Sequence, residues 1–316
     1  MNIIKNRYWY FFISLLVIIP GLIFMGIGWA SSAHSPLTLG IDFTGGSLLE
    51  VQFQGQRPSV DQINAIYTQF STTAKPLSDP IIQPLGEDSY SIRSKQMGDD
   101  TKKQVIAAMQ AASGAPVTVL NFTDVSPSIG AEVARAAGYA ILLAALAILA
   151  YIWYAFRGVE HAFRFGAAAV IAMLHDVLVV LGVEAMLGYF LGWEADALFL
   201  TALLTVIGFS VHDTIVVFDR VRENSTVFRR VNFESVVNHS IVQTLDRSIN
   251  TQLTVMFTLF ALVLFGGDSI RHFVIILLVG IFSGTYSSIF NASPILVVWE
   301  NKEWRNWFRR KELETL

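Results

Sequence analysis

The sequence predicts a polytopic α-helical membrane protein with six transmembrane helices and one extracytoplasmic ferredoxin-like α+β domain between helices 1 and 2. Three observations lead to this fold class. Of the 316 residues, 53% are hydrophobic and only 15% are charged, and the mean hydropathy is +0.51, whereas soluble domains average about 25% charged residues. Six apolar runs are long enough to cross a bilayer, which takes roughly 20 residues. The one long polar stretch, between the first two runs, alternates strand and helix patterns.

The six apolar runs differ in strength. The first follows Lys5 and Arg7, as in a signal peptide, but its length of about 23 residues exceeds the ~7–15 residues of a signal core, so we expect a retained helix. The fifth is the weakest, because its strongly apolar part, 253–265, has only 13 residues; this helix must extend back through polar sequence to span the bilayer. The predicted spans are residues 9–30, 136–156, 165–190, 197–218, 241–266 and 272–298.

Lysine and arginine residues predict the orientation, because cytoplasmic flanks are enriched in them. Cations occur in the two tails, 1–8 and 299–316, in the link between the second and third runs, and in the connector 219–240. The links after the third and fifth runs hold one cation between them, Arg271. We therefore expect both termini to be cytoplasmic and the polar stretch 31–135 to be extracytoplasmic.

The polar stretch 31–135 has the element order βαββαβ, which is that of the split-βαβ, ferredoxin-like unit. The assignments rest on alternating apolar residues for strands and on a 3.6-residue period for helices. No residue pattern in this domain points to catalysis. The predicted strands are residues 48–54, 80–84, 90–93 and 117–124, and the predicted helices are residues 60–70 and 99–112.

The polar connector 219–240 carries apolar residues at near-helical spacing, including Val227, Val231 and Val237. That pattern predicts a helix lying at the membrane interface. In the tail 299–316, tryptophans alternate with cations, which is typical of anchoring among lipid headgroups.

Composition also excludes several classes of function. The chain has no cysteine, which excludes disulfides, thiolate nucleophiles and thiolate metal sites. Its formal net charge is −3, with no basic domain and no glycine-rich phosphate loop, so nucleic acid is not an expected partner. We expect no cofactor, no resident metal and no enzymatic activity.

The segment VIGFSVHDTIVVFDRVREN, from Val206 to Asn224, places an acid inside a membrane span. Asp213 follows His212 well before the charged exit of that span at Asp219. An ionised aspartate at mid-bilayer costs roughly 2.5–3.5 kcal/mol on insertion scales, so it normally faces a protein interior and serves protons, ions or a paired cation. Asp213 is therefore a candidate proton or ion relay; the alternative is a polar residue that only helps helices pack.

Arg247, in the fifth span, is the expected partner of Asp213. Thr251, Thr254 and Thr258 continue the Arg247 face at i+4, i+7 and i+11. A polar stripe of this kind should face the helix bundle, because lipid offers it no hydrogen-bond partners. The alternative is that Arg247 extends to the interface as a topogenic charge.

Two His-Asp pairs, His175-Asp176 and His212-Asp213, lie in neighbouring spans. Adjacent residues on a helix point about 100° apart, so neither pair chelates one metal ion by itself. Pairs from facing helices could do so, but no HExxH-type spacing supports it. Two intramembrane aspartates also suggest an aspartic protease, yet the Tyr-Asp and Gly-x-Gly-Asp patterns of those enzymes are missing.

The motif GIDFTGG opens the polar stretch directly after the first span. On physical grounds it is a turn, in which Gly40, Gly45 and Gly46 allow positive φ and the side chain of Asp42 caps backbone groups. Such a cluster is weak evidence for ligand binding.

Taken together, these residues resemble the SecF family, the smaller half of the bacterial SecDF protein-export complex, over the whole chain. One departure is His212, where the family commonly has asparagine before the aspartate. The motifs that carry the resemblance are GIDFTGG at 40–46, VSPSIGAEV at 125–133, LHD at 174–176, GFSVHDTIVVFDRVREN at 208–224 and RSINTQLT at 247–254.

The resemblance implies a fold related to the resistance-nodulation-division transporters, in which two six-span halves form a pseudo-symmetric unit. It implies a location in the bacterial inner membrane, and a function with SecD: use of the proton gradient to complete export of preproteins emerging from the SecYEG channel. Asp213 and Arg247 match the family's proton pathway, to which SecD adds a further aspartate. We include His212, Thr251 and Asp176 as candidate pathway residues because they adjoin these groups or share their character.

Two other functions remain open at this point. The chain could be half of a proton-coupled small-molecule exporter, although a single outer domain of about ninety residues leaves little room for the binding pocket such a pump needs. It could also be a scaffold that stabilises a membrane complex without moving protons. A scaffold should tolerate asparagine at Asp213, and a relay should not.

Overall fold

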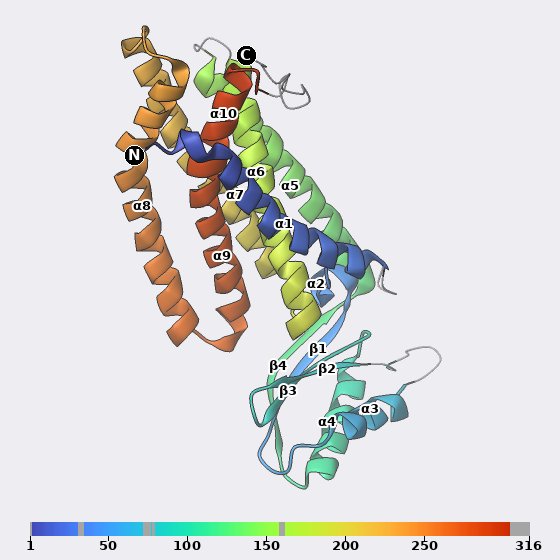
Figure 1. The fold of residues 1–316 in the computed structure, drawn as a ribbon. Coiled ribbons are helices and arrows are strands. Elements are labelled where there is room, and N and C mark those ends of the chain that lie inside the picture. Colours follow the sequence, from blue (N-terminus) through green and yellow to red (C-terminus); the bar gives the residue numbers. More distant parts are fainter. Residues whose placement is uncertain (1, 31–34, 72–76, 78–79, 158–161, 304–316) are drawn as a thin grey trace, which may run out of the picture. The chain divides into compact units, whose positions relative to one another are not determined.

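The computed structural model describes residues 2–30, 35–71, 77, 80–157 and 162–303 (Figure 1). The chain divides into two compact units. One is helical and the other contains the sheet. The helical unit comprises Met1–Leu37, Ile141–Trp193 and Leu198–Leu316, and the sheet unit comprises Thr38–Ala140 and Glu194–Ala197.

The sheet unit has the predicted βαββαβ order. Its four strands form an antiparallel sheet in the order β2-β3-β1-β4, which is the ferredoxin-like arrangement, and every predicted boundary lies within two residues of the observed one. The elements are β1 (Gly46–Phe53), α3 (Val60–Gln69), β2 (Ile81–Leu85), β3 (Ser89–Ser94), α4 (Asp99–Ser113) and β4 (Val117–Val125).

The core of this unit follows from the alternation along β1 and the apolar faces of the two helices. Leu49 and Val51 are buried on one face of the sheet against Ile63 of α3 and Met109 of α4. Burial of each such side chain contributes roughly 1.5–3 kcal/mol. Helix α3 begins at a capping box, in which Ser59 and a glutamine three residues later exchange hydrogen bonds.

The helical unit contributes the spans. Among the described residues, six helical segments are long and apolar enough to cross a membrane. Four are single helices, one joins the short 3₁₀ helix η1 (Ile4–Asn6) to α1, and one is continuous through a π-helical turn, η2 (Ser288–Ala292). The other helices are α1 (Arg7–Ala30), α5 (Pro127–Phe156), α6 (Ala162–Leu191), α7 (Ala197–Val227), α8 (Phe233–Phe265), α9 (Asp268–Ser287) and α10 (Ser293–Glu300).

Glycines allow the central helices to approach closely. A Cβ on Gly21 of α1 would lie 2.5 Å from the Cα of Gly182 of α6, so these helices cross at a pair of glycines. On α9, a Cβ on Gly284 would lie 3.2 Å from the Cα of Ser210 of α7. Small residues at helix contacts are the usual basis of packing in membranes. They bring α1 onto α6 and α9 onto α7, and α6 also packs on α9 (Figure 1).

The connector 219–240 differs from its prediction. Helix α7 continues to Val227 and α8 begins at Phe233, with Asn232 accepting a hydrogen bond of 2.7 Å from the backbone of Ser235. The prediction of a separate interfacial helix is therefore wrong for the described residues. The near-helical spacing came from the ends of two long helices, and Val237 is buried in the bundle. The tryptophans predicted to anchor the tail lie outside the described residues.

Helix α5 also begins earlier than the predicted boundary at 136. It begins at Pro127, two residues after β4 ends, and is continuous to Phe156. Proline is well suited to the first turn of a helix, where its missing N–H has no intrahelical partner. The second span is therefore the membrane part of a longer helix that starts in the sheet unit.

Candidate functional site

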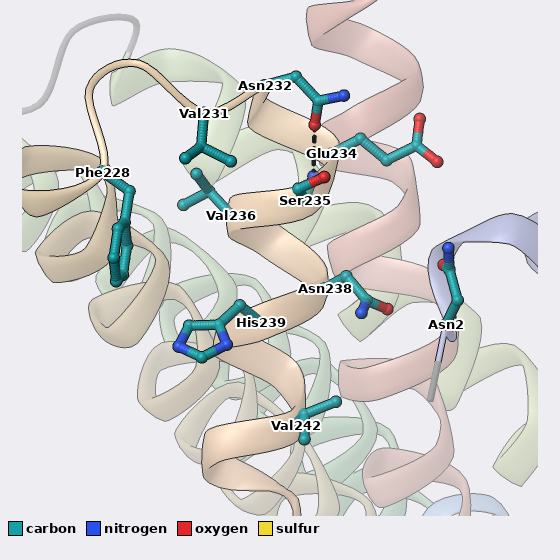
Figure 2. Close-up of a pocket in the computed structure, with 10 residues that line it drawn as sticks. All are labelled: Asn2, Phe228, Val231, Asn232, Glu234, Ser235, Val236, Asn238, His239 and Val242. Carbon is teal, nitrogen blue, oxygen red and sulfur yellow. Dashed lines mark hydrogen bonds between the residues drawn. The ribbon is translucent and has the colours of Figure 1, made fainter.

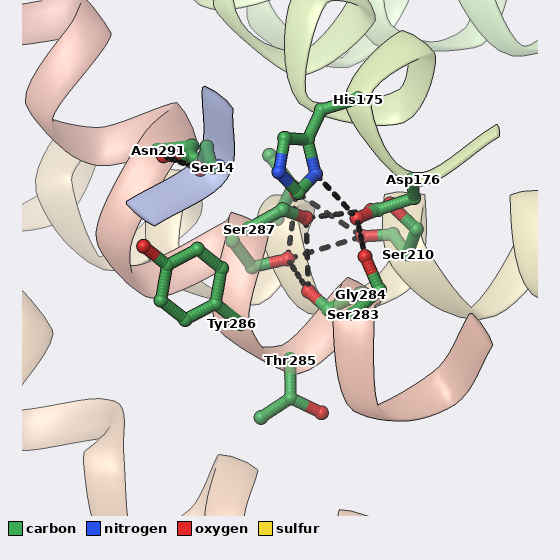
Figure 3. Close-up of polar contacts among 12 residues, drawn as sticks. Ser14, His175, Asp176, Ser210, Ser283, Gly284, Thr285, Tyr286, Ser287 and Asn291 are labelled. Atoms are coloured by element: carbon green, nitrogen blue, oxygen red, sulfur yellow. Dashed lines mark hydrogen bonds and ion pairs between the residues drawn. The ribbon is translucent and has the colours of Figure 1, made fainter. Parts of the chain in front are cut away.

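Asp176, in the middle of α6, is the centre of a buried polar cluster. Its side chain is 1% exposed. Ser210 of α7 and Ser287 of α9 donate to Oδ2 at 2.5 and 2.6 Å, and Ser283 of α9 donates to Oδ1 at 2.6 Å. Figure 3 shows the three hydroxyls converging on the carboxylate. Three helices are thus joined through one side chain.

His175 completes the ring of donors. Its Nδ1 lies 3.0 Å from Oδ1 of Asp176, and its Nε2 is buried without a hydrogen-bond partner among the described residues. A carboxylate accepts and does not donate, so Nδ1 carries the proton in the neutral tautomer that fits this contact. Nε2 is then an acceptor. Within the described ranges, no group of three or more acidic or histidine side chains is arranged to hold a metal ion.

Further hydroxyls connect the same helices. Thr214 of α7 and Ser288 of the π turn are 2.9 Å apart, and Ser14 of α1 exchanges hydrogen bonds with Asn291. Each group would carry a penalty if buried in an apolar medium without a partner. The network therefore favours one arrangement of α1, α6, α7 and α9.

Asp213, on α7, has a much simpler environment. It is 4% exposed, and its hydrogen-bond partner in the described chain is Gln252 of α8, whose amide nitrogen donates to Oδ2. The other atom of that amide, Oε1, is buried without a partner among the described residues. His212, which directly precedes Asp213, is exposed. Asp213 thus lies in a membrane helix with an amide, and no cation, bonded to it.

The predicted pairing of Asp213 with Arg247 is wrong within this chain. Arg247 and Thr251 are exposed, Arg247 makes no ion pair with any described residue, and Thr251 donates to the backbone oxygen of Arg247 at 2.8 Å. The stripe that these two begin lies on the outer side of α8. A second series of polar residues, spaced four apart, is the one buried in the bundle: Ser240, Thr244, Ser248 and Gln252.

The glycine motif after the first span is hydrogen-bonded to residues 195–197, which belong to the same sheet unit. The backbone N–H of Gly40 donates to Ala195 at 2.8 Å, and Asp42 Oδ2 accepts a 2.9 Å hydrogen bond from the N–H of Ala197. Ala197 is the first residue of α7, so Asp42 caps that helix from a distant part of the chain, a favourable position for a carboxylate.

Gly45 and Gly46 have φ values of 74° and 131°, which side chains with a Cβ rarely adopt. A Cβ on Gly45 would also lie 2.6 Å from the Cα of Pro127. The first two motifs of the sequence therefore pack directly on each other. Their role here is structural, and nothing in their geometry forms a ligand site.

Two more acids have a partner within their own unit. Glu184 of α6 is buried, and its Oε2 is 2.8 Å from Nε2 of His272 on α9. In the sheet unit, Arg93 forms an ion pair of 2.6 Å with Glu194. Burial raises the pKa of Glu194, and the charge of Arg93 partly offsets that rise.

A hollow of about 740 Å³ lies at the N-terminal end of α8 (Figure 2). The N-terminal segment borders it, because Asn238 accepts a 2.8 Å hydrogen bond from the backbone of Ile3. Arg7 also bridges Glu234 and Glu303, at 3.3 and 2.7 Å. These contacts fix the start of α1 against α8 and the end of the sixth span.

Gln252, Ser210, Ser283 and Ser287 were not singled out from the sequence. The two α9 serines are four residues apart in the polar run SGTYSS of the sixth span, a spacing that places them on one helix face. The spacing within this run could therefore have identified Ser283 and Ser287 from the sequence. Gln252 adjoins Thr251 but points about 100° away from it, so the stripe chosen from the sequence missed it.

Comparisons with known proteins agree with this architecture. Residues 104–302 match the family described as protein export membrane protein SecD/SecF, C-terminal, and residues 30–56 match the SecD/SecF GG motif. The protein translocase subunit SecF of Anaerolinea thermophila is 52% identical over 312 residues, which cover 98% of this chain and 97% of the relative. SecF of Thermobaculum terrenum is 46% identical over 99% of this chain and 98% of its own length.

Solved structures give the same result. SecDF from Thermus thermophilus, a translocon-associated membrane protein, matches 95% of this chain with a TM-score of 0.78 and 29% identity. This chain covers 39% of that SecDF chain. SecDF in a super-membrane-facing form matches 97% of this chain with a TM-score of 0.65. The protein is a membrane protein with six candidate spans in the part of the chain that the structure describes, and it belongs to the SecF family of protein translocase subunits.

Proposed function

We propose that this chain works with SecD to couple proton movement to late-stage export of preproteins through the SecYEG channel, and that Asp213 is the acid that takes up and releases the proton. The observation that carries the proposal is the setting of Asp213: a buried carboxylate in the middle of a membrane helix, bonded to a neutral amide. Intramembrane acids of this kind normally mark ion or proton pathways.

Gln252 is suited to both protonation states of Asp213. An amide has donor and acceptor ends. Its NH₂ group donates to the carboxylate in the arrangement observed. After protonation, rotation of the amide brings Oε1, which now lacks a partner, into position to accept from the carboxylic acid. A proton can therefore be gained or lost without leaving Asp213 unpaired.

The exposed polar stripe on α8 supports a partner subunit. Among the described residues, Arg247 and Thr251 have no partners beyond helix backbone, and lipid provides none. A coupled transporter also needs a second half, with its site at the interface between halves. This chain covers 39% of the SecDF chain that it matches, which leaves length in that chain for a second half. SecD is the partner that this reasoning favours.

Replacement of Asp213 by asparagine tests the function. With SecD, SecYEG and a preprotein in proteoliposomes, D213N should abolish stimulation of export by a proton gradient while leaving protein level and SecD association near normal. The matched control is Asp219→Asn on the same helix, at an acid paired with Arg222 on the surface. Gradient-stimulated export by D213N would remove Asp213 from the mechanism and favour a scaffold.

Arg247→Met tests the partner. Loss of one member of a buried ion pair costs about 3–5 kcal/mol, so if SecD buries Arg247 opposite an acid, R247M should lower gradient-driven export at least about tenfold. The free energy of unfolding of the lone chain should change by less than about 0.5 kcal/mol, because Arg247 is exposed there. Arg230→Met, at another exposed cation, is the control. Equal export by both variants would contradict the proposal.

The proposed orientation has both termini in the cytoplasm and the sheet unit outside. Because the chain has no cysteine, single-cysteine variants give a clean readout. Glu87→Cys in the sheet unit should react with an impermeant thiol reagent added to intact cells, and Ser225→Cys near the end of α7 should not. The reverse pattern would overturn the orientation.

A further inference from the structure

A second feature of the bundle lies beside the Asp176 cluster. A cavity of about 320 Å³ is bounded by α1, α6, α8 and α9. Its walls are almost entirely apolar, with Val179 on α6 and Met256 on α8, and it opens beside Val17 and Phe282, which are exposed on the surface of the bundle. Its volume falls at the lower end of the range for ligand pockets, about 300–1,000 Å³.

One unpaired polar atom reaches this cavity. His175 lines it with a side chain that is only 10% exposed, and Nε2 has no hydrogen-bond partner among the described residues. The other polar groups lining the cavity are satisfied. Ser283 donates to Asp176, Tyr286 donates to the backbone oxygen of Tyr10 at 2.8 Å, and Ser14 bonds with Asn291.

The chemistry of Nε2 restricts the occupant. In the neutral imidazole, the Nδ1 that faces the carboxylate of Asp176 carries the proton, which makes Nε2 an acceptor. The occupant must therefore donate. A buried water molecule needs about 2–4 polar partners, and the cavity offers one. A charged group is disfavoured at membrane depth, so the donor belongs to a neutral molecule with an apolar body.

We infer that the cavity binds an uncharged aliphatic alcohol, with its hydroxyl donating to His175 Nε2 and its hydrocarbon chain lying against Val179, Met256 and Phe282. Such a molecule reaches the site from the bilayer, on the side where the cavity opens. It would contact the imidazole that also contacts Asp176, so occupancy and the orientation of His175 are linked.

Photolabelling tests this site directly. The probe is 1-octanol carrying a diazirine, added to the full chain in lipid nanodiscs, with labelled residues identified by mass spectrometry. Labelling should concentrate at Met256, Val179 and Phe282. Excess 1-octanol should compete about fivefold better than octane, because only the alcohol can make the hydrogen bond. Labelling spread evenly over all lipid-facing residues, or equal competition by octane, would overturn the inference.

Two variants separate the parts of the proposal. Val279→Trp fills the cavity and should remove the concentrated labelling, whereas Leu16→Trp, at an exposed position of α1 outside the cavity, should leave it unchanged. His175→Phe keeps an aromatic ring without Nε2, so labelling should persist and the preference for octanol over octane should vanish. A preference retained in H175F would refute the role of Nε2.

A final comparison includes the partner. The same labelling is carried out on the complex of the chain with SecD. Concentrated labelling at Met256 should be retained, because the inferred occupant comes from the bilayer. Its loss in the complex would mean that a partner helix fills the cavity, which contradicts the inference.

Discussion

The two aspartates of the membrane helices present a contrast. Asp176 and Asp213 each follow a histidine, and each is almost fully buried. Yet Asp176 is surrounded by three serine hydroxyls and His175, while Asp213 has one amide from Gln252. The same dipeptide thus lies in two different settings. The oxygens of Asp176 accept four hydrogen bonds and join helices, whereas Asp213 accepts one from Gln252 and keeps the spare capacity that the proposed proton role requires.

The preceding histidines differ in the same way. His175 contacts its neighbouring carboxylate and is largely buried, whereas His212 is exposed. Successive helical residues point about 100° apart, so a His-Asp dipeptide does not predict a shared site. Packing against the surrounding helices determines whether the histidine side chain contacts the neighbouring carboxylate. This contrast leads to three predictions.

The largest expected effect is on stability at Asp176. Asp176→Ala removes the acceptor of three buried hydroxyls, and each unsatisfied group costs about 1–3 kcal/mol. Some serines can return to helix carbonyls, as Ser287 does at 3.2 Å to Gly284, so we expect a net loss of about 3 kcal/mol. The measurement is unfolding of the purified chain in detergent. Asp219→Ala, at an exposed acid, should change the free energy by less than about 0.5 kcal/mol. An unchanged unfolding midpoint for D176A would contradict the helix-joining role of Asp176.

An intermediate effect is expected at Gln252. Gln252→Leu removes the partner of Asp213 with little change in volume. A hydrogen bond to a charged group is worth about 1.5–3 kcal/mol, so gradient-driven export should fall about tenfold or more. Its dependence on pH should also change, which a purely structural role would not cause. Ser248→Ala, one turn earlier on the same face of α8, is the control, and it should keep the pH profile of the parent.

The smallest effect concerns Glu194, a partly buried acid that forms an ion pair with Arg93. Its pKa is raised in the folded state by burial, with Arg93 opposing that rise. A raised pKa means that the folded chain binds the proton more tightly than the unfolded chain, so this contribution to stability is complete below the ordinary value of 4.5 and is lost as pH rises through the folded value.

Glu194→Gln should therefore flatten the fall in stability of the full chain above about pH 4.5, by up to about 1 kcal/mol. Unfolding followed at several pH values measures this. Glu87→Gln, at an exposed acid of the same unit, should leave the slope as in the parent. A steeper fall in E194Q would show that the ion pair with Arg93 outweighs burial.

Much of the fold could be predicted from the sequence because it depends on simple periodicities. The sheet unit shows the alternation along β1 and the apolar face of α3, and the spans follow from hydropathy. The end of α7 and the start of α8 were harder. Their apolar residues repeat with the helical period whether they belong to one interfacial helix or to the ends of two long ones.

The partners of the acids could not be predicted in the same way. Helix α8 carries two polar series, one starting at Ser240 and one at Arg247, and charge complementarity favoured the wrong one. Hydrophobicity does not decide between two polar faces. Serines in membrane helices also commonly bond to their own backbone, so nothing in the sequence alone shows that Ser210, Ser283 and Ser287 reach across to Asp176.

The π turn at Ser288–Ala292 sets the rotational phase of the sixth span. On one side of it, Ser283 and Ser287 face Asp176; on the other, Glu300 meets Arg164 at the start of α6. Each residue of an α-helix advances the face by about 100°, and a π turn absorbs one extra residue. The two contacts can be made together because that residue is present. The extra residue of the π turn thus keeps both sets of contacts in register. Insertion or deletion of one residue in this segment would rotate one set away from its partners.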